Sequence, residues 1–401
     1  MRLLRSERFS ALLLLLAAVL GLVLANTAIG PGLLELKGAH LGWAAIGLDL
    51  SIGHWVSDGL LAIFFFIVAV ELRRELVVGE LASPAKALLP AIAAAGGVIT
   101  PALVYLLIAV VLPGGTGGAG LEAGWPIPTA TDIAFALGVL GLFGRWIPGR
   151  VRVFLLALAV LDDLVGILII AFFFTDTVEL PFLGLAAACV AVFGVLSRML
   201  KPRAAWMLAR RPAWPIALAL VVLGVLAWYF VLRSGVHATI AGVLLGLVIA
   251  RSPGAHAEHR LEPFSNGIVL PLFAFSAAAV AIPAVAPAEL SPAFWAIVVA
   301  LPVGKIVGIT LFGTVGGLIA ARRSGPSARI PTVDVIVVGV LGGIGFTVAL
   351  LMNELAFGRS HAVADQGTLA VLLGSGIAML ASAFAVTARS RHYARTLARR
   401  G

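Results

Sequence analysis

Charged residues and cysteine are both scarce in this chain of 401 residues. Only 12% of the residues are Asp, Glu, Lys or Arg, whereas 61% are hydrophobic, and this balance excludes an ordinary soluble domain. The single cysteine, Cys189, excludes an intramolecular disulfide bond. Linkers and low-complexity tracts are also lacking, so no soluble domain fits between the hydrophobic segments. We therefore expect one integral membrane domain over residues 1–401.

Hydrophobic segments of about 20 residues, the length that crosses a bilayer, are abundant. They predict an all-α polytopic membrane protein with about twelve transmembrane helices. The predicted spans are 9–26, 55–78, 84–112, 127–145, 150–174, 180–200, 212–232, 235–250, 264–283, 292–321, 330–352 and 366–388.

The net charge of +9 comes from basic residues whose positions indicate topology. With twelve spans, all but four of the 28 Lys and Arg fall in the two termini, in every second loop or in the span ends that flank those loops; the exceptions are Lys37, Arg233, Lys305 and Arg359. This is the positive-inside pattern, so we expect both termini in the cytoplasm and no nucleic-acid partner. The start of the chain also resembles a secretory signal. Its removal would leave eleven spans and break the charge pattern, so we expect the first helix to be retained.

Three aspartates and one lysine lie inside these hydrophobic segments: Asp132, Asp162, Asp163 and Lys305. A charged side chain at bilayer depth costs about 2.5–3.5 kcal/mol, so four cost about 10–14 kcal/mol before pairing. Because stability alone would not retain such a set, it indicates an ion or proton pathway. For Lys305, a purely neutralising role is the structural alternative.

Two of the predicted spans are interrupted. The segment Trp125–Asp132 contains two prolines, and the segment Gly339–Thr347 contains four glycines. Proline removes a backbone donor and glycine weakens a helix, and unwound backbone is tolerated in a membrane only where protein buries it or it lines an aqueous cavity. Both segments therefore indicate a binding site, although tight helix packing explains Gly342-Gly343 equally well.

The interruptions lie in the middle of two three-span groups, residues 84–174 and 292–388. Corresponding interruptions favour inverted repeats with two broken helices that cross near the substrate site. We therefore expect these two groups to form the core of the protein. The helices within 9–78 and 180–283 would form the interface part.

Asp162 and Asp163 are neighbours, so their side chains diverge by about 100° around a helix. One of them can pair with Lys305, the only base inside a span. The other, with Asp132, Thr131 and free carbonyl groups, can supply the hard oxygen ligands that an alkali cation needs. Because desolvation favours the protonated form of a carboxyl group, protons and a cation would compete for the same oxygens. Exchange of a cation for protons requires such competition.

A second set of charges lies in segments predicted to be cytoplasmic. Glu71, Arg74 and Glu75 share one helix face by their spacing, and Glu258 and His259 lie in another inner loop. Solvated surface patches account for both groups. The alternative is a charged funnel that gates access in response to pH.

Three further polar residues have simple structural interpretations. His237 is typical of a histidine in helix packing, and Asp58 and Asp334 start predicted spans, where acids favour helix N-termini. The external connection from residue 27 to 54 contains the alternating stretch Trp43–Leu50. A short β-hairpin and an irregular loop fit that stretch equally well.

Several longer motifs occur in order along the chain: Asp58-Gly59, Glu71–Glu75, Ile127–Ala136, Asp162–Leu164, Arg233–Thr239, Leu270–Phe275, Gly304-Lys305 and Gly343–Thr347. Together they resemble the bacterial NhaA-type sodium–proton antiporters along nearly the whole chain. The resemblance implies an NhaA-like fold in the inner membrane of a bacterium. It further implies that Asp163, Asp132 and Thr131 bind the transported sodium, and that Asp162 pairs with Lys305.

The same resemblance implies an activity and its regulation. The expected activity is electrogenic exchange of sodium, and of lithium, for protons by alternating access, with no enzyme activity and no cofactor beyond the transported ions. The expected partner besides the lipid bilayer is a second copy of the chain, joined partly through the external hairpin. The residues at positions associated with pH regulation are Glu71, Arg74, Glu75, His237, Glu258 and His259.

Two other functions fit the intramembrane aspartates. An intramembrane aspartyl protease needs two carboxyl groups on separate helices that share a proton, which Asp132 and Asp163 could supply. The Gly-x-Gly-Asp sequence is absent, and a buried lysine would disturb proton sharing. A cation channel would need a continuous pore, whereas charges that titrate favour a carrier.

Overall fold

The computed structural model describes residues 7–111, 120–175, 178–200, 214–283, 286–325, 330–358 and 360–398, and nearly all of them are helical. Within these ranges nine helices are long and apolar enough to cross a bilayer, and two bent helix pairs raise the number to eleven. The expected eighth span is a shorter apolar helix, α11 (Thr239–Val248). The all-α polytopic architecture is confirmed. The basic segments 1–6 and 201–213, used above for topology, lie outside the described residues.

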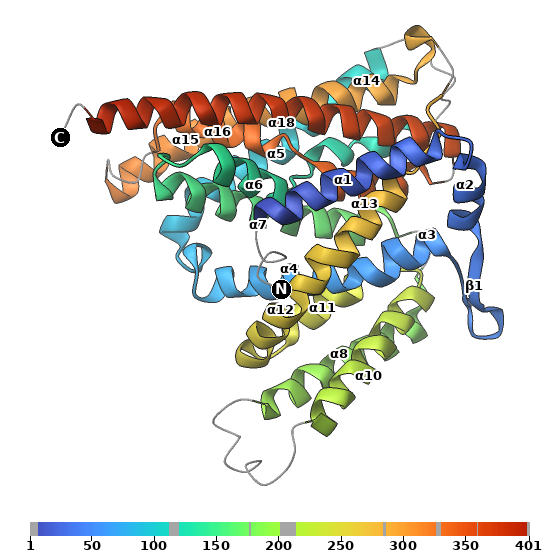
Figure 1. The fold of residues 1–401 in the computed structure, drawn as a ribbon. Coiled ribbons are helices and arrows are strands. Elements are labelled where there is room, and N and C mark those ends of the chain that lie inside the picture. The colour runs from blue at the N-terminus through green and yellow to red at the C-terminus, as the bar shows by residue number, and fades with distance from the viewer. Residues whose placement is uncertain are drawn as a thin grey trace.

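Figure 1 shows a helical bundle that α18 (His361–Ala398) crosses from end to end. A β-hairpin lies at one end of the bundle, here called the hairpin end, and the C-terminus lies at the other, the C-terminal end. The other long helices are α1 (Glu7–Ala25), α4 (Leu61–Val77), α5 (Pro84–Val111), α7 (Gly149–Phe173), α8 (Leu180–Met199), α10 (Trp214–Arg233) and α15 (Lys305–Ser324). The shorter ones are α2 (Gly30–Gly38), α3 (Ile52–His54), α6 (Ile133–Phe143), α12 (Arg251–Phe264), α13 (Leu270–Ala278), α14 (Pro292–Val299), α16 (Thr332–Gly342) and α17 (Phe346–Phe357).

The hairpin interpretation of the external connection is confirmed. Strands β1 (His40–Trp43) and β2 (Leu48–Ser51) pair antiparallel, with Trp43 opposite Leu48. The turn between them positions the carbonyl of Ile46, which accepts hydrogen bonds from α10. Helix α2, which precedes the hairpin, was not expected. Its Gly-Pro-Gly start is typical of a turn, but proline is also tolerated in the first turn of a helix, and that is where it lies.

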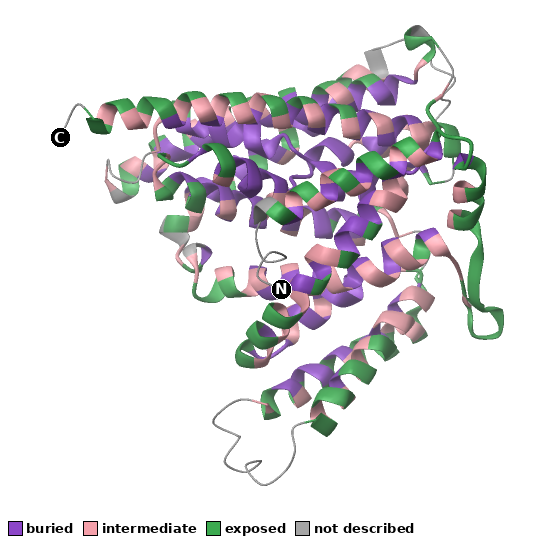
Figure 2. Ribbon diagram, in the orientation of Figure 1, coloured by how far each residue is buried: buried purple, intermediate pink, exposed green. Residues whose placement is uncertain are grey.

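The helices fall into two sets of neighbours. Helix α5 packs along α15, and α14, α16, α17 and α18 join them, whereas α4 packs on α11 and α8 on α10. Figure 2 shows buried residues concentrated beneath α18, while α8 and α10 at the edge of the bundle are largely exposed or half-buried. The expected division into core and interface segments stays a prediction. The inverted-repeat relation between residues 84–174 and 292–388 stays a prediction.

Both predicted interruptions are present. A single 3-10 turn, Ile127–Thr129, leads into extended backbone at Ala130–Asp132 before α6 begins. In the second interruption α16 ends and α17 begins after a break, with a bend of 50°. A Cβ on Gly345 would lie 3.1 Å from the carbonyl oxygen of Ala130, so glycine here lets the two interrupted segments approach closely. The other bent pair, α1 and α2 at 111°, was not predicted.

The span that carries Lys305 is not a uniform helix. A π-helical segment, Ala300–Gly304, separates α14 from α15, and Lys305 is the first residue of α15. Gly304 lies against α5, where an added Cβ would approach the Cα of Pro101 to 2.5 Å. Widened turns of this kind are common at functional sites. The sequence pattern gave no sign of this one.

Candidate functional site

The two interrupted segments hydrogen-bond to each other in the middle of the bundle. The backbone N–H of Asp132 donates to the carbonyl of Ile344 at 2.6 Å. The hydroxyl of Thr131 donates to the carbonyl of Gly342 at 3.0 Å. Backbone groups released by each break are therefore satisfied by the other segment, as buried polar groups must be. Residues about 210 positions apart in sequence thus form one joint.

Asp132 caps the helices that leave this joint. One carboxylate oxygen accepts from the backbone N–H of Phe135 at 3.2 Å, at the start of α6. The other accepts from the backbone N–H and the hydroxyl of Thr347 at 3.2 Å and 2.6 Å, at the start of α17. A negative group at two helix N-termini interacts favourably with the positive ends of both helix dipoles. Asp132 therefore stabilises the crossing, and both of its oxygens already accept hydrogen bonds.

Thr347 is a hydrogen-bond partner of Asp132 in this joint that reasoning from single residues missed. It was noted only as the last residue of the motif Gly343–Thr347. Its position at the second residue of α17, directly after a glycine-rich break, places its backbone N–H among the unpaired donors of a helix N-terminus. That position is the sequence signal that could have identified it as a partner for a buried acid.

Lys305 pairs with Asp162, which settles the choice that the residues alone left open. Its ammonium nitrogen lies 2.5 Å from Oδ2 of Asp162, and both side chains are fully buried. The same nitrogen donates to the hydroxyl of Thr131 at 3.0 Å. Thr131 thus accepts from Lys305 and donates to Gly342, so it links the ion pair to the end of α16. A buried charge without such partners would cost several kcal/mol.

Asp163 is buried beside this pair but forms no hydrogen bond with either of its members in the described structure. It is 8% exposed, and no described residue donates a hydrogen bond to its carboxylate. The charged groups that act on it electrostatically are Asp162, Asp132, Glu71 and Lys305. Buried carboxylates are normally hydrogen-bonded, so an uncommitted one at this depth is suited to bind a proton or a cation.

The predicted ligand set comes together only in part. Asp163, Asp132 and Thr131 lie around one joint, but Asp132 and Thr131 are engaged in hydrogen bonds there. Among the described residues no group of three His, Cys, Asp or Glu side chains is arranged to hold a metal ion. A cation at Asp163 would therefore share the oxygens of Asp132 and Thr131 with their present donors, or use carbonyl groups.

The second predicted charge cluster is formed from two separate segments. Arg74 lies 2.8 Å from Glu258 of α12 and 3.4 Å from Glu71 of its own helix, α4. Glu75 lies on α4 and His259 on α12, the two helices that this contact joins. Arg74 is 44% exposed, so the pairs contribute at most about 1 kcal/mol each to stability. Glu71 is also one of the groups that act on Asp163, which connects this cluster to the buried site.

His237 does not join that cluster. Its Nδ1 lies 3.3 Å from Oδ1 of Asp58, and Asp58 is itself 8% exposed. The carbonyl of Asp58 accepts from the indole N–H of Trp228 at 2.9 Å. His237 is thus a partner of a buried acid rather than a histidine in purely apolar packing.

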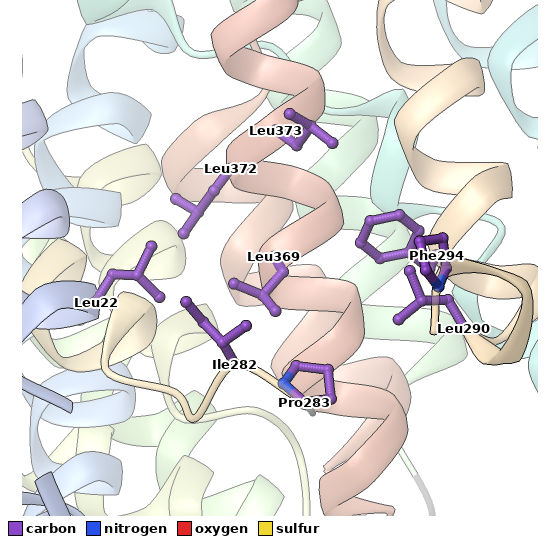
Figure 3. Close-up of a pocket in the computed structure, with 9 residues that line it drawn as sticks. Leu22, Ile282, Pro283, Leu290, Phe294, Leu369, Leu372 and Leu373 are labelled. Atoms are coloured by element: carbon purple, nitrogen blue, oxygen red, sulfur yellow. The ribbon is translucent and has the colours of Figure 1, made fainter. Parts of the chain in front are cut away.

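A large cavity in the described structure is unrelated to these charges. It has a volume of about 430 Å³. Figure 3 shows apolar side chains from α1, α18 and the connection before α14 around it. Its lining offers no carboxylate or hydroxyl for a cation. The residues that line it are Leu22, Ile282, Pro283, Pro287, Leu290, Phe294, Leu369, Leu372 and Leu373.

A polytopic helical bundle with buried acids at the crossing of two interrupted helices defines the class of membrane ion transporters. The sequence model of one family, described as Na+/H+ antiporter 1, matches residues 1–386. The chain belongs to this family. The predicted resemblance is therefore confirmed, and the chain is a transporter rather than an enzyme.

Individual relatives align with this chain over nearly its full length. The chain is 58% identical over 389 residues to "Na(+)/H(+) antiporter NhaA 2" of Clavibacter michiganensis subsp. michiganensis (strain NCPPB 382), covering 97% of this chain and 92% of that protein. It is 45% identical over 378 residues to "Na(+)/H(+) antiporter NhaA" of Tropheryma whipplei (strain Twist), with 94% and 92% covered. It is 43% identical over 408 residues to "Na(+)/H(+) antiporter NhaA 1" of Kineococcus radiotolerans, with 98% and 90% covered.

Proposed function

We propose that this protein exchanges sodium for protons across a bacterial inner membrane, with both termini in the cytoplasm. The observation that carries the proposal is the contrast between the three buried aspartates. Asp132 is hydrogen-bonded to two helix starts and Asp162 to Lys305, whereas the Asp163 carboxylate accepts no hydrogen bond from the described residues.

Competition at Asp163 is the proposed mechanism. A carboxylate can bind a proton or a sodium ion on the same oxygens, but the bound proton removes the charge that attracts the cation. Sodium that arrives from the cytoplasm displaces the proton, and a proton that arrives from outside displaces sodium. Alternating exposure of the site to the two sides converts this competition into antiport. No resident cofactor is required.

The ion pair next to this site has a proposed part in electrogenicity. Lys305 and Asp162 neutralise each other in this structure. If the two side chains move apart, each loses the charge that stabilises its own charged form, so their proton affinities change. With Asp163, the pair offers a second titratable group for each sodium ion. Exchange of more protons than sodium ions would move net charge across the membrane. Lithium, which binds the same hard oxygens, would be carried too.

Regulation by pH is proposed for the charges at the C-terminal end. Arg74 and Glu258 connect α4 to α12, with Glu71 and Glu75 on α4 and His259 on α12, and Glu71 acts electrostatically on Asp163. At the hairpin end, the His237–Asp58 pair is a second candidate. The exposed hairpin is the proposed contact between two copies of the chain in the bilayer.

Proteoliposomes containing a pH-sensitive dye test the proposal. An acid interior is established, and sodium, lithium or potassium is then added outside. We expect sodium and lithium to dissipate the proton gradient in liposomes that contain the wild type. In liposomes that contain the Asp163→Asn variant, neither ion should dissipate it. A gradient that collapses without any added cation would indicate a channel. Indifference of the wild type to sodium would contradict the proposal.

A further inference from the structure

A fully buried carboxylate, Asp334, lies at the start of α16, outside the site described above. It is 0% exposed. Its Oδ1 accepts from Nε of Arg389 at 2.7 Å, and its Oδ2 accepts from the hydroxyl of Tyr393 at 2.6 Å. A helix N-terminal acid, the simple interpretation of its position, needs neither partner. The two partners both come from the last turns of α18.

The two partners also contact each other. The Tyr393 hydroxyl donates to Asp334 and accepts from the guanidinium group of Arg389 at 3.3 Å. The guanidinium of Arg389 also lies 4.6 Å from the centre of the Tyr393 ring. These three side chains join the start of α16 to α18.

A second bond supports this junction from the neighbouring turn. The backbone N–H of Trp146, in the connection from α6 to α7, donates to the hydroxyl of Ser390 at 3.2 Å. Ser390 lies between Arg389 and Tyr393 in sequence and is buried. The connection between α6, which Asp132 caps, and α7 is therefore also attached to α18.

The helices that meet here are those that build the ion site. Asp334 precedes Gly342, whose carbonyl accepts from Thr131, by eight residues, or roughly 12 Å along α16. Trp146, held by Ser390, lies three residues before α7 begins at Gly149, and Gly149 precedes Asp163 by fourteen residues, or roughly 21 Å along α7. A helix transmits a displacement of its end along its axis. The junction at α18 therefore fixes the positions of Thr131 and Asp163 relative to each other.

We propose that Asp334, Arg389 and Tyr393 form a clamp at the C-terminal end, defined by these three side chains, which positions α16 against α7 and so sets the cation affinity of the Asp163 site. These are positioning residues, since they act through two helices and touch no ion. The inference rests on the proposed sodium–proton exchange. It assigns to the last helical turns of the chain a part in substrate affinity.

The test compares apparent sodium affinity among variants in proteoliposomes, with rates normalised to the amount of folded transporter. Arg389→Gln leaves a buried carboxylate without its charged partner, and we expect its KM for sodium to rise about three- to tenfold, with a smaller change in maximal rate. Arg391→Gln is the matched control, because Arg391 is exposed on the same helix two residues away. It should keep the wild-type KM.

A double variant separates positioning from a general loss of stability. Asp334→Asn combined with Arg389→Gln removes both charges and leaves none uncompensated. Its KM should lie closer to the wild-type value than that of Arg389→Gln alone. If Arg389→Gln does not fold, Tyr393→Phe, which removes one hydroxyl, should still raise KM by about twofold.

Three outcomes would overturn the clamp. They are a wild-type KM in folded Arg389→Gln, a wild-type KM in Tyr393→Phe, and a KM in the double variant as high as that of Arg389→Gln alone, or higher. Failure of the proposed function is distinguishable from these, because the wild-type protein itself would then show no sodium-dependent proton movement.

Discussion

Oδ2 of Asp162 lies 2.5 Å from the ammonium nitrogen of Lys305, whereas Asp163, the next residue, receives no hydrogen bond from the described residues. Two identical side chains one position apart thus have different environments, because a helix turns by about 100° between them. One is neutralised by a fixed base, and the other has no fixed counter-charge, so a proton or a cation can neutralise it. Most of the predictions below follow from this difference.

Neutralisation of Asp163 should abolish exchange. Asp163→Asn keeps the size of the side chain but removes the charge that attracts the cation, so sodium-dependent dequenching of a pH dye in proteoliposomes should fall to the level of empty liposomes. Glu35→Gln, exposed in α2 and outside the hairpin, is the control and should transport like the wild type. Sustained exchange by Asp163→Asn would mean that another group carries the ions.

Removal of Lys305 should destabilise the fold more than removal of the whole ion pair. Lys305→Gln leaves a buried carboxylate at Asp162 without its counter-charge, which costs about 3–5 kcal/mol. Combination with Asp162→Asn should recover most of that loss. Both stability changes are measured by heating the protein in detergent and using size-exclusion chromatography to determine the fraction that stays folded. Equal melting temperatures for the single and double variants would contradict the claim that Lys305 neutralises a buried Asp162.

The hydroxyl of Thr347 should contribute to the crossing of the broken helices. Thr347→Val preserves shape but leaves one oxygen of Asp132 with a single donor, and we expect a loss of about 1–3 kcal/mol in stability together with weaker sodium binding. Thr347→Ser restores the hydroxyl and should recover both. A valine variant as stable and as active as the wild type would show that the contact is dispensable.

Close approach at Gly304 should be essential to the position of Lys305. A Cβ there would lie 2.5 Å from the backbone of Pro101, so Gly304→Ala must push α15 away from α5. The expected destabilisation is about 1–3 kcal/mol, with reduced exchange. The control is Gly376→Ala, since nothing lies within 4 Å of a Cβ at Gly376 of α18. If both alanine variants behave alike, the close contact does not position Lys305.

The Arg74–Glu258 contact should affect the pH response rather than the maximal rate. Glu258→Gln removes the charge that holds Arg74 at 2.8 Å and joins α12 to α4. We expect the pH profile of exchange to shift while the rate at its optimum changes by less than about twofold, because a half-exposed pair contributes little to stability. Glu179→Gln, exposed elsewhere, should leave the profile in place. An unchanged profile in Glu258→Gln would leave this cluster a solvated surface patch.

Sequence reasoning located the fold and the site because both depend on strong local signals. Long apolar segments require helices, and charges inside them are costly enough to mark Asp162, Asp163 and Lys305. The interruptions were equally visible, since prolines before Asp132 and glycines before Phe346 disfavour a helix. Hydrophobic length thus predicted most spans, although the span expected at 235–250 became a helix of ten residues.

Other features depended on contacts that no local pattern contains. The residues alone left two adjacent aspartates as partners for Lys305. The family resemblance implied Asp162, and the orientation of α7 relative to α15 places that carboxylate at the ammonium group. The bonds from Thr347 to Asp132 and from Arg389 to Asp334 join residues 215 and 55 positions apart. Helix α2 and the π-helical segment before Lys305 depend on tertiary packing that overrides turn and helix preferences.

Sodium binding to the purified protein across a pH series tests the central claim most directly, with proton release measured in the same titration. If sodium and protons compete at the Asp163 site, each bound sodium releases at least one proton, and the apparent Kd weakens at least about tenfold per unit of falling pH once the site is protonated. Asp163→Asn should bind no sodium at any pH. A Kd that stays constant across the titration, with no protons released, would contradict the account.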